Sequence, residues 1–584
     1  MSLKQSSEFV PAPSVNRGQV VHIYPDSKHE RIVYASGKSI IIRGIKDPSL
    51  TSVYQGHIYQ TTVAKFSPSG YYVASGDING NVRIWDAVNE EHILKSEFRP
   101  ISGAIRDISW DPDSQRVLVV GEGKEKFGHV FTFDSENSVG TIDGHSKVVN
   151  GCSMRTKRPF RAVTCSDDMT VVFFQGTPYK YVKAIRDHSG FVNDVKYSPD
   201  GSYFVSVGSD QKILMYDGLN GDLIGQIGTP QTNHKGSIYA VSWSPDSKKI
   251  MTSSGDKTVK IWDVETKDVL KTVKIGNDNS PMNMQMGNVW TEDYMLSVSL
   301  SGDINILSKE AEVPEKILQS HQKSITASVI DSDDLLYTGS MYEEPRVIEG
   351  SSQVNCLALG RNGKDIVIGT MDDTVSFMKE GRKVKLPGAP KHMGYVYGSD
   401  TLVASLSTNK VVFVESNGEV KEIREIPETA TCVAVHPSKA EIAVGFNDNS
   451  VNTYSVVGNE VKIKEKMNSN RRAITSLSYS ESGKYIASGD GAGKIYVFET
   501  GSGELVTGHW VYHTAAINGM VWMGDEHMVS CSLDTNVYVW SIKTPSQHTA
   551  LMNIHSGGVN CIASNGQKVV TCGVDGVIKT FLFS

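Results

Sequence analysis

The feature that most constrains this chain is an internal repeat of about 42 residues. One copy runs from Gly56-His57 through Phe66-Ser67-Pro68-Ser69-Gly70 to Val82-Arg83-Ile84-Trp85-Asp86. The pattern returns with Asn233-His234, Trp243-Ser244-Pro245-Asp246 and Ile261-Trp262-Asp263, and again with Asp187-His188, Tyr197-Ser198-Pro199-Asp200-Gly201 and Tyr216-Asp217. Such self-similarity predicts an array of equivalent small units rather than a few unrelated domains.

Each copy holds three short segments of alternating β-branched and aromatic residues, separated by Gly, Asp, Asn or Ser-Pro turns. A weaker fourth strand is expected after each Trp-Asp position, as at residues 92–95. A single four-stranded blade has two apolar faces that it cannot bury alone, so blades stack around a ring until it closes. These copies resemble WD40 repeats, and the resemblance implies β-propellers.

Composition agrees with a globular fold. With 39% hydrophobic and 21% charged residues, the chain is not expected to be disordered, collagen-like or a coiled coil.

The number of repeats predicts the number of rings. Fourteen units are counted from the residue that ends each third strand: Ile42, Trp85, Phe133, Phe174, Tyr216, Trp262, Leu307, a degenerate copy at 341–348 interrupted by Pro345, then Met378, Val414, Tyr454, Phe498, Trp540 and Phe581. Rings usually hold 4–8 blades. The expected fold is therefore all-β, with two seven-bladed WD40 β-propellers in tandem, at residues 15–318 and 319–584.

The last repeat comes out one strand short. Its third strand runs to the last residue, 584, which leaves no residues for an outer fourth strand, whereas the seventh repeat is followed by residues 313–318. An open ring would expose an unpaired sheet edge. We therefore expect the N-terminal residues 1–14, about 6–11 in particular, to close the second propeller.

Charge and cysteine usage exclude several classes of function. The net charge of −7 is spread without long runs, so neither nucleic acid nor a membrane surface is an expected partner. No apolar run approaches the ~20 residues that cross a bilayer, and residues 1–16 lack the apolar stretch of a signal peptide. Seven cysteines without a CxxC pair favour a reducing compartment inside the cell and argue against a zinc site.

The histidines are explained by the repeat rather than by catalysis. Seven of them share one repeat position: His57, His145, His188, His234, His321, His513 and His555. In WD40 blades this histidine bonds to a turn aspartate, here six residues before the strand-ending aromatic, as in Asp256 with Trp262.

Other motifs that could indicate catalysis or binding are explained without either. The run 489–494 resembles a phosphate loop but lacks the Ser or Thr after its lysine. Basic runs at 155–161 and 379–385 are interpreted as solvated loops. No catalytic residue or cofactor is expected, so the protein is predicted not to be an enzyme.

Repeats three to five carry more specific motifs. They include Ile105-Arg106-Asp107-Ile108-Ser109-Trp110-Asp111, Val119-Val120-Gly121-Glu122-Gly123 with Phe127-Gly128, Arg158-Pro159-Phe160-Arg161, Ser166-Asp167-Asp168, Gln175-Gly176-Thr177-Pro178-Tyr179-Lys180-Tyr181 and Phe191-Val192-Asn193-Asp194-Val195. With two seven-bladed propellers, these motifs resemble the actin-interacting protein 1 (WD-repeat protein 1) family.

The resemblance implies a non-enzymatic, monomeric protein of the cytoplasm and the cortical actin cytoskeleton. Such a protein binds actin filaments decorated with ADF/cofilin and promotes their severing, disassembly and barbed-end capping, without a cofactor. The family motifs place the partner-binding residues at Glu125, Asp167, Tyr181 and Phe191, where Tyr181 replaces the Phe usual in the family. Spacing independently marks Asp167 as an extra acid, because Asp168 already fills the turn position six residues before Phe174.

Alternatives remain for both the function and the site. A generic WD40 scaffold, in a ubiquitin ligase or an RNA-processing complex, would share the fold but would not sediment with actin. A propeller enzyme is disfavoured because the strands lining the channel show no convergent catalytic set. For Tyr181 and Phe191, the competing interpretation is packing within the blades, where strand-flanking aromatics are commonly buried.

Overall fold

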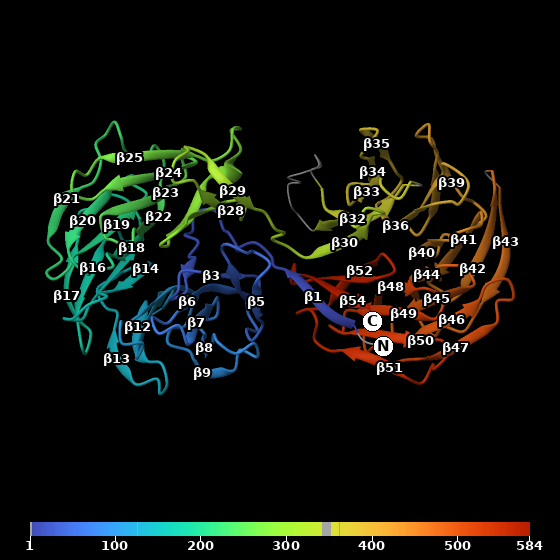
Figure 1. Cartoon of the computed structure of the whole chain (residues 1–584), viewed down its shortest axis with the longest axis horizontal. Helices are drawn as coiled ribbons and strands as arrows, with labels where there is room; N and C mark the ends of the chain where they lie inside the picture. The colour runs from blue at the N-terminus through green and yellow to red at the C-terminus, as the bar shows by residue number, and fades with distance from the viewer. Residues whose placement is uncertain (1–2, 125, 341–351, 361, 459, 584) are drawn as a thin grey trace. The chain divides into compact units, whose positions relative to one another are not determined.

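The computed structural model describes residues 3–124, 126–340, 352–360, 362–458 and 460–583. Within these ranges the secondary structure is β-strand apart from one short 3-10 helix, η1 (Pro281–Asn283). No helix in the described ranges is long and apolar enough to cross a membrane. The strands form thirteen four-stranded sheets and one two-stranded sheet (Figure 1). The prediction of an all-β fold of tandem WD40 propellers is confirmed.

The chain divides into two compact units, at residues 11/12 and 322/323. The spacing of the repeats predicts these divisions at 14/15 and 318/319, a few residues away. The first unit comprises residues 12–322, and the second comprises residues 1–11 with 323–584.

Seven sheets of four consecutive strands make up the first unit, coloured from blue to yellow-green in Figure 1. Its strands are β2 (Tyr24–Pro25), β3 (Arg31–Ser36), β4 (Ser39–Gly44), β5 (Thr51–Tyr54), β6 (Thr61–Phe66), β7 (Tyr72–Asp77), β8 (Val82–Asp86), β9 (Leu94–Phe98), β10 (Ile105–Trp110), β11 (Arg116–Gly121), β12 (Gly128–Thr132), β13 (Ser138–Thr141), β14 (Val149–Met154), β15 (Arg161–Ser166), β16 (Val171–Gln175), β17 (Lys180–Ile185), β18 (Val192–Tyr197), β19 (Tyr203–Gly208), β20 (Ile213–Asp217), β21 (Leu223–Gln226), β22 (Ile238–Trp243), β23 (Lys249–Ser254), β24 (Thr258–Asp263), β25 (Val269–Lys274), β26 (Gln285–Trp290), β27 (Met295–Ser299), β28 (Ile304–Leu307) and β29 (Pro314–Leu318).

The first strands of successive sheets contact one another, from β6 through β10, β14, β18 and β22 to β26. The ring closes where Val21, just before β2, donates its backbone N–H to Met286 O of β26 at 2.9 Å. The fourth strand of the second sheet, β9, begins two residues later than residues 92–95 predict. His92 has a left-handed φ of 46° and belongs to the preceding turn.

The second unit holds β1 (Leu3–Phe9), β30 (Ile325–Ile330), β31 (Leu336–Ser340), β32 (Val354–Leu359), β33 (Ile366–Thr370), β34 (Thr374–Phe377), β35 (Arg382–Lys385), β36 (Pro390–Tyr395), β37 (Leu402–Leu406), β38 (Val411–Val414), β39 (Val420–Glu422), β40 (Ala430–Val435), β41 (Glu441–Phe446), β42 (Val451–Val457), β43 (Glu460–Met467), β44 (Ile474–Tyr479), β45 (Tyr485–Asp490), β46 (Ile495–Glu499), β47 (Leu505–Trp510), β48 (Ile517–Met523), β49 (His527–Ser532), β50 (Val537–Ser541), β51 (His548–Leu551), β52 (Val559–Ser564), β53 (Lys568–Gly573) and β54 (Ile578–Phe583). β30 pairs with β31 in a two-stranded sheet. The degenerate repeat predicted at 341–348 lies outside the described residues.

Strand β1 is the outer strand of the sheet β1-β54-β53-β52 and runs antiparallel to β54. Leu3 faces Phe583 and Phe9 faces Ile578. Figure 1 shows the blue N-terminal strand lying beside the red C-terminal strand. β30 packs against β52, so this sheet lies next to the first sheet of the same unit. The strand begins at residue 3, earlier than the predicted segment 6–11.

A chain of side-chain hydrogen bonds recurs inside the blades. Trp262 Nε1 donates to Thr252 Oγ1 at 2.9 Å, the Thr252 hydroxyl lies 2.8 Å from His234 Nε2, and His234 Nδ1 lies 2.9 Å from Asp256 Oδ2. The predicted His–Asp contact recurs in His57–Asp77, His145–Asp168, His188–Asp210, His513–Asp534 and His555–Asp575. These histidines and aspartates therefore stabilise the blades.

All seven cysteines are free, and they lie on the first and second strands of their sheets. Six are buried, as small apolar residues are expected to be. Cys561 is the exception, because it is partly exposed.

Candidate functional site

Three of the four predicted site residues, Asp167, Tyr181 and Phe191, lie on two neighbouring sheets of the first unit, β14–β17 and β18–β21. In a sheet of four consecutive antiparallel strands, the connection into the first strand and the connection between the second and third emerge at the same edge. Residues 142–148, 167–170 and 186–191 are such connections. The connections that carry Asp167 and Phe191 therefore meet at one edge of the ring.

Asp167 and Asp168 are adjacent but have different partners. Asp168 Oδ2 lies 3.0 Å from His145 Nδ1, and hydrogen bonds from His145 and Thr170 hold the pKa of Asp168 below its ordinary value although burial opposes this. Asp167 is partly exposed, and its Oδ1 accepts a 2.7 Å hydrogen bond from Asn150 Nδ2. The interpretation of Asp168 as the turn acid and Asp167 as an additional one therefore agrees with the hydrogen bonds.

Phe191 precedes β18 and exposes 45% of its surface. Its backbone carbonyl accepts a hydrogen bond from the N–H of Ser209 at 2.8 Å, which fixes the start of the sheet. The Nζ atom of Lys147 lies over the ring, 5.7 Å from its centre. The ring is thus held at the surface with a cation beside it, rather than packed within a blade.

Tyr181 lies in β17 opposite Phe174 and exposes 49% of its surface. Its ring covers Gly144 so closely that a Cβ added there would lie 2.7 Å from Tyr181 Cε2. Gly144 has a φ of +97°, a left-handed conformation that glycine adopts readily. The ring packs on a neighbouring connection while about half of it remains exposed.

One connection touches all three residues. Residues 143–148 place Gly144 under Tyr181, Lys147 over Phe191, and the carbonyl of Val148 3.1 Å from the N–H of Asp167. We call residues 143–148 with Asp167, Tyr181 and Phe191 the bridging-loop site. Glu125, the fourth predicted residue, lies outside the described residues.

Lys147 of this site and Asn150 beside it are absent from the sequence prediction. Asn150 Nδ2 donates to Asp167 Oδ1 and, at 3.0 Å, to the carbonyl of Val192, next to Phe191. It therefore links Asp167 to the start of β18. A signal in the sequence was their position, two and five residues after the repeat histidine His145, where the connection enters the next blade.

The basic run at 155–161 is not a freely solvated loop, as the sequence suggested. Arg155 is buried and donates from Nε to the carbonyl of Gly201 at 2.8 Å and from Nη1 to the carbonyl of Lys157 at 2.9 Å. This guanidinium is therefore occupied in holding the connection between β14 and β15 to the adjacent sheet.

A buried charged cluster crosses the centre of the first unit. Lys196 Nζ lies 3.0 Å from Asp107 Oδ2, from Asp194 Oδ1 and from the Tyr24 hydroxyl oxygen. The Tyr24 hydroxyl in turn donates to Asp107 Oδ1 at 2.6 Å. Burial lowers the pKa of Lys196, but the two carboxylates outweigh it and raise that pKa well above its ordinary value.

The same cluster contains potential metal ligands. His22, Asp107 and Asp194 each have a ligand atom within 4.8 Å of the others. The Lys196 ammonium contacts both carboxylates and so takes the place that a metal cation would need. This donor set therefore fits the lysine that it contacts.

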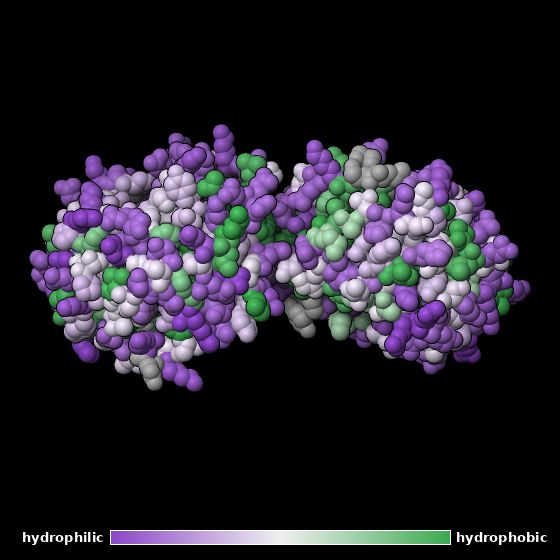
Figure 2. All heavy atoms as spheres, turned by 90° about the horizontal axis from the view of Figure 1, so that it is seen from below, coloured by the Kyte–Doolittle hydropathy of each residue, from purple (hydrophilic) through white to green (hydrophobic). Residues whose placement is uncertain are grey.

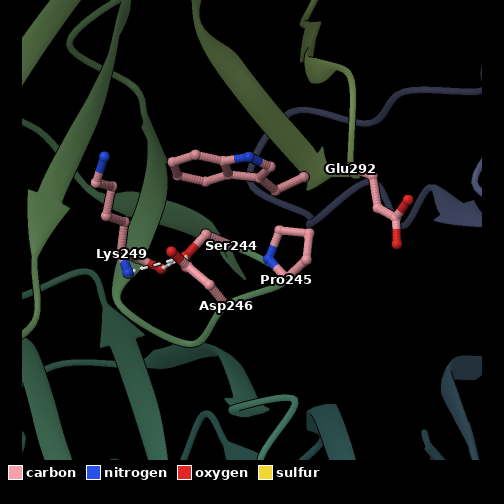
Figure 3. A pocket seen from close by; sticks show the side chains of 6 residues that line it. Ser244, Pro245, Asp246, Lys249 and Glu292 are labelled. Carbon is pink, nitrogen blue, oxygen red and sulfur yellow. Dashed lines mark hydrogen bonds between the residues drawn. The ribbon is translucent and has the colours of Figure 1, made fainter.

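A separate cavity of about 400 Å³ lies at the opposite edge of the first unit (Figure 3). It is lined by Ser244, Pro245, Asp246, Lys249, Trp290 and Glu292. These residues lie at or beside the connections between the first and second strands of two sheets, which emerge away from the bridging-loop site. The cavity is therefore not part of that site.

Hydrophobic residues on the surface of each unit are interspersed with polar ones. In Figure 2, green hydrophobic groups alternate with purple hydrophilic residues on the visible face. This face therefore presents separate apolar side chains among polar ones.

The ring geometry and the repeated Trp–Ser/Thr–His–Asp hydrogen bonds define a WD40-repeat protein. The family model described as "WD domain, G-beta repeat" matches residues 48–86, 136–175, 179–217, 226–263, 462–499, 504–541 and 546–581. These matches lie in both units.

Similarity to curated proteins extends along nearly the whole chain. WD repeat-containing protein 1 of Xenopus tropicalis is 37% identical over 572 residues, which cover 94% of this chain and 93% of that protein. Actin-interacting protein 1 of Drosophila melanogaster is 36% identical over 570 residues, with 94% and 92% covered. The chain belongs to the WD repeat-containing protein 1/actin-interacting protein 1 family, as its motifs predict. This is a family of WD40 proteins that are not enzymes.

Proposed function

We propose that this protein binds actin filaments decorated with ADF/cofilin and promotes their severing and disassembly and the capping of their barbed ends. The observation that carries the proposal is the bridging-loop site, in a chain with 36% identity to a protein named for interaction with actin. There, one connection holds a partly exposed acid, Asp167, and two half-exposed rings, Tyr181 and Phe191. The proposed location is the cytoplasm, at cortical actin structures.

This side-chain set suits a protein partner. Aromatic anchors supply most of the binding energy at many protein interfaces because they lose water over a large area. Asp167 contributes a carboxylate that attracts Lys or Arg side chains on the partner surface, and this attraction guides the encounter. Glu125 is proposed as a second acid of this surface on the basis of its motif alone.

Filament disassembly needs no bond-breaking chemistry from this protein. If it binds the cofilin-altered filament, or its newly exposed ends, more tightly than the unaltered filament, it shifts the equilibrium toward the bound form. The size of this shift is limited by the difference between the two affinities. The proposal therefore requires preference for decorated filaments, not merely affinity for actin.

Pelleting of filaments with and without cofilin tests the proposal. The soluble actin fraction is expected to rise only when cofilin and this protein are both present. A generic WD40 scaffold would leave actin in the pellet under all conditions, and that result would overturn the proposal. Sedimentation equilibrium of the purified chain tests the proposed monomer, expected at 63.8 kDa.

Paired substitutions assign the effect to the bridging-loop site. Asp167→Arg with Phe191→Ala is expected to abolish the rise in soluble actin while leaving the melting temperature unchanged. The matched control is Glu292→Arg with Tyr71→Ala, which changes an exposed acid and a 63%-exposed ring at the opposite edge. Equal loss of activity in both double variants would show that the bridging-loop site is not the binding surface.

A further inference from the structure

Two cysteines face each other in the sheet that β1 completes. Cys561 on β52 and Cys572 on β53 are direct partners in the antiparallel register. Directly opposite residues in antiparallel strands have Cα atoms about 4.5–5.5 Å apart, which falls within the roughly 4.4–6.8 Å range of disulfides. The backbone therefore already provides the separation that a bond between these residues needs.

The two thiols also share one environment. Both pack in a single apolar cluster with Ile325 and Val570. A hydrogen bond with the Cys561 thiol is the largest cause of the raised pKa of Cys572, and burial adds to it. The sulfur atoms are therefore neighbours on the same face of the sheet.

Their exposures differ in a way that assigns an order of reaction. Cys572 has no exposed surface, whereas Cys561 is partly exposed. Thiolate character and access to solvent decide which cysteine an oxidant reaches first. Cys561 is accessible to a small oxidant, and Cys572 is placed directly behind it.

A second cysteine pair in the chain provides a matched comparison. Cys152 on β14 and Cys165 on β15 lie on the same two strand positions of another sheet, but Cys152 faces Thr164 and Cys165 faces Gly151. Because successive side chains alternate between the faces of a strand, these two thiols point to opposite faces. Both are completely buried, so neither contact nor access favours a bond.

We propose that Cys561 and Cys572 form a reversible oxidation site, which closes to an intrachain disulfide when the protein meets a hydroperoxide. The Cys561 thiol first releases its proton, and the thiolate attacks the peroxide, so an S–O bond forms and the O–O bond breaks. For hydrogen peroxide, the leaving hydroxide takes up the released proton and departs as one water. The Cys572 sulfur then attacks the sulfenic sulfur. An S–S bond forms, the S–O bond breaks, and the hydroxide leaves with the Cys572 proton as a second water. Two thiols lose two electrons to one peroxide, and a dithiol reductant returns them.

The experiment uses the full-length chain and hydrogen peroxide as the probe. After treatment, remaining thiols are alkylated, the protein is digested without reduction, and peptides are identified by mass spectrometry. The expected result is one cross-linked peptide pair joining residues 561 and 572, with two hydrogens lost. Two of the seven thiols should become resistant to alkylation, and dithiothreitol should restore both.

Variants decide whether this pair is responsible. Cys561→Ser and Cys572→Ser should each abolish the cross-link, while Cys152→Ser with Cys165→Ser should leave it at its original level. Cys561→Ala repeats the test at the partly exposed position if Cys572→Ser does not fold. Cys531, a buried cysteine on β49, belongs to the neighbouring sheet that packs against β52. The proposal is overturned if Cys561 is oxidised to sulfinic acid while Cys572 stays alkylatable, or if the bond joins Cys561 to Cys531.

Discussion

The ammonium nitrogen of Lys147 lies 5.7 Å from the centre of the Phe191 ring, so a cation covers one face of an aromatic side chain that is 45% exposed. A surface cation–π contact contributes about 0.5–1 kcal/mol. Its main effect in the bridging-loop site is to hold Phe191 in one orientation while the rest of the ring remains available to a partner.

Phe191→Ala is expected to weaken binding to cofilin-decorated filaments by at least about tenfold, since a desolvated aromatic anchor contributes more than about 1.4 kcal/mol. Lys147→Met keeps the aliphatic stem and removes the charge, so a loss of about two- to fivefold is expected. Co-sedimentation at varied protein concentration measures both affinities. A larger loss for Lys147→Met than for Phe191→Ala would show that the cation, not the ring, contacts the partner.

Gly144→Ala tests the contact beneath Tyr181. The added methyl group would lie 2.7 Å from Tyr181 Cε2 and would also meet the strain of a φ of +97°. We expect about 1–2 kcal/mol of destabilisation from the backbone and a displaced ring. Gly18→Ala is the control, because Gly18 has a φ of +84° but open space around its Cβ position. Both variants should lose stability in thermal melts, but only Gly144→Ala should also lose filament binding.

How far the site could be predicted depended on whether its residues share a repeat position. Asp168 was identifiable because turn acids recur at a fixed spacing, and that left Asp167 as the extra acid. The Lys147–Phe191 contact joins two connections whose approach is set by the packing of neighbouring blades. Asp107 and Lys196 come together across the ring from different sheets, and no spacing in the sequence relates them. The pairing of Cys561 with Cys572 depends on a register shift between Val559 and Cys561.

Deletion of residues 1–11 tests whether the second unit depends on strand β1. The deletion removes the partner of β54 and the buried Leu3, which packs with Val539 and Phe581. It stops before Ala12 and Ser14, whose backbone N–H groups bond to His321 and Ala35 of the first unit. The exposed sheet edge should lower the melting temperature of the second unit only.

Calorimetry should then resolve an earlier transition for the second unit and an unshifted one for the first. Leu3→Ala provides a milder version, expected to cost about 2–4 kcal/mol because it leaves a cavity. Unchanged melting of both units after the deletion would contradict the proposed domain organisation.

Substitution of Lys196 tests the buried charged cluster. Lys196→Met leaves the carboxylates of Asp107 and Asp194 without their shared cation, and breaking a buried ion pair in this way costs about 3–5 kcal/mol. Lys65→Met is the control, because Lys65 lies over the Tyr24 ring and its pKa is lowered by burial and by repulsion from Lys196. Denaturant unfolding should show a large loss for Lys196→Met and a smaller one for Lys65→Met. The reverse order would mean that Lys196 is not the ion that balances the cluster.

The His234–Asp256 pair predicts how stability depends on pH. Burial lowers the pKa of His234 in the folded protein, so the unfolded chain takes up this proton first as the pH falls below the ordinary value of 6.5. Burial would raise the pKa of Asp256, but hydrogen bonds from His234 and Thr258 hold it below its ordinary value of 3.8. The stability contributed by Asp256 is therefore complete above pH 3.8 and is lost below it.

Thermal melts at a series of pH values check both contributions. The melting temperature should fall in two stages, below about pH 6.5 and again below about pH 3.8. The first stage should be smaller in His234→Gln than in the parent protein. A melting temperature that rises between pH 6.5 and 5 would contradict the assignment of a neutral, buried His234.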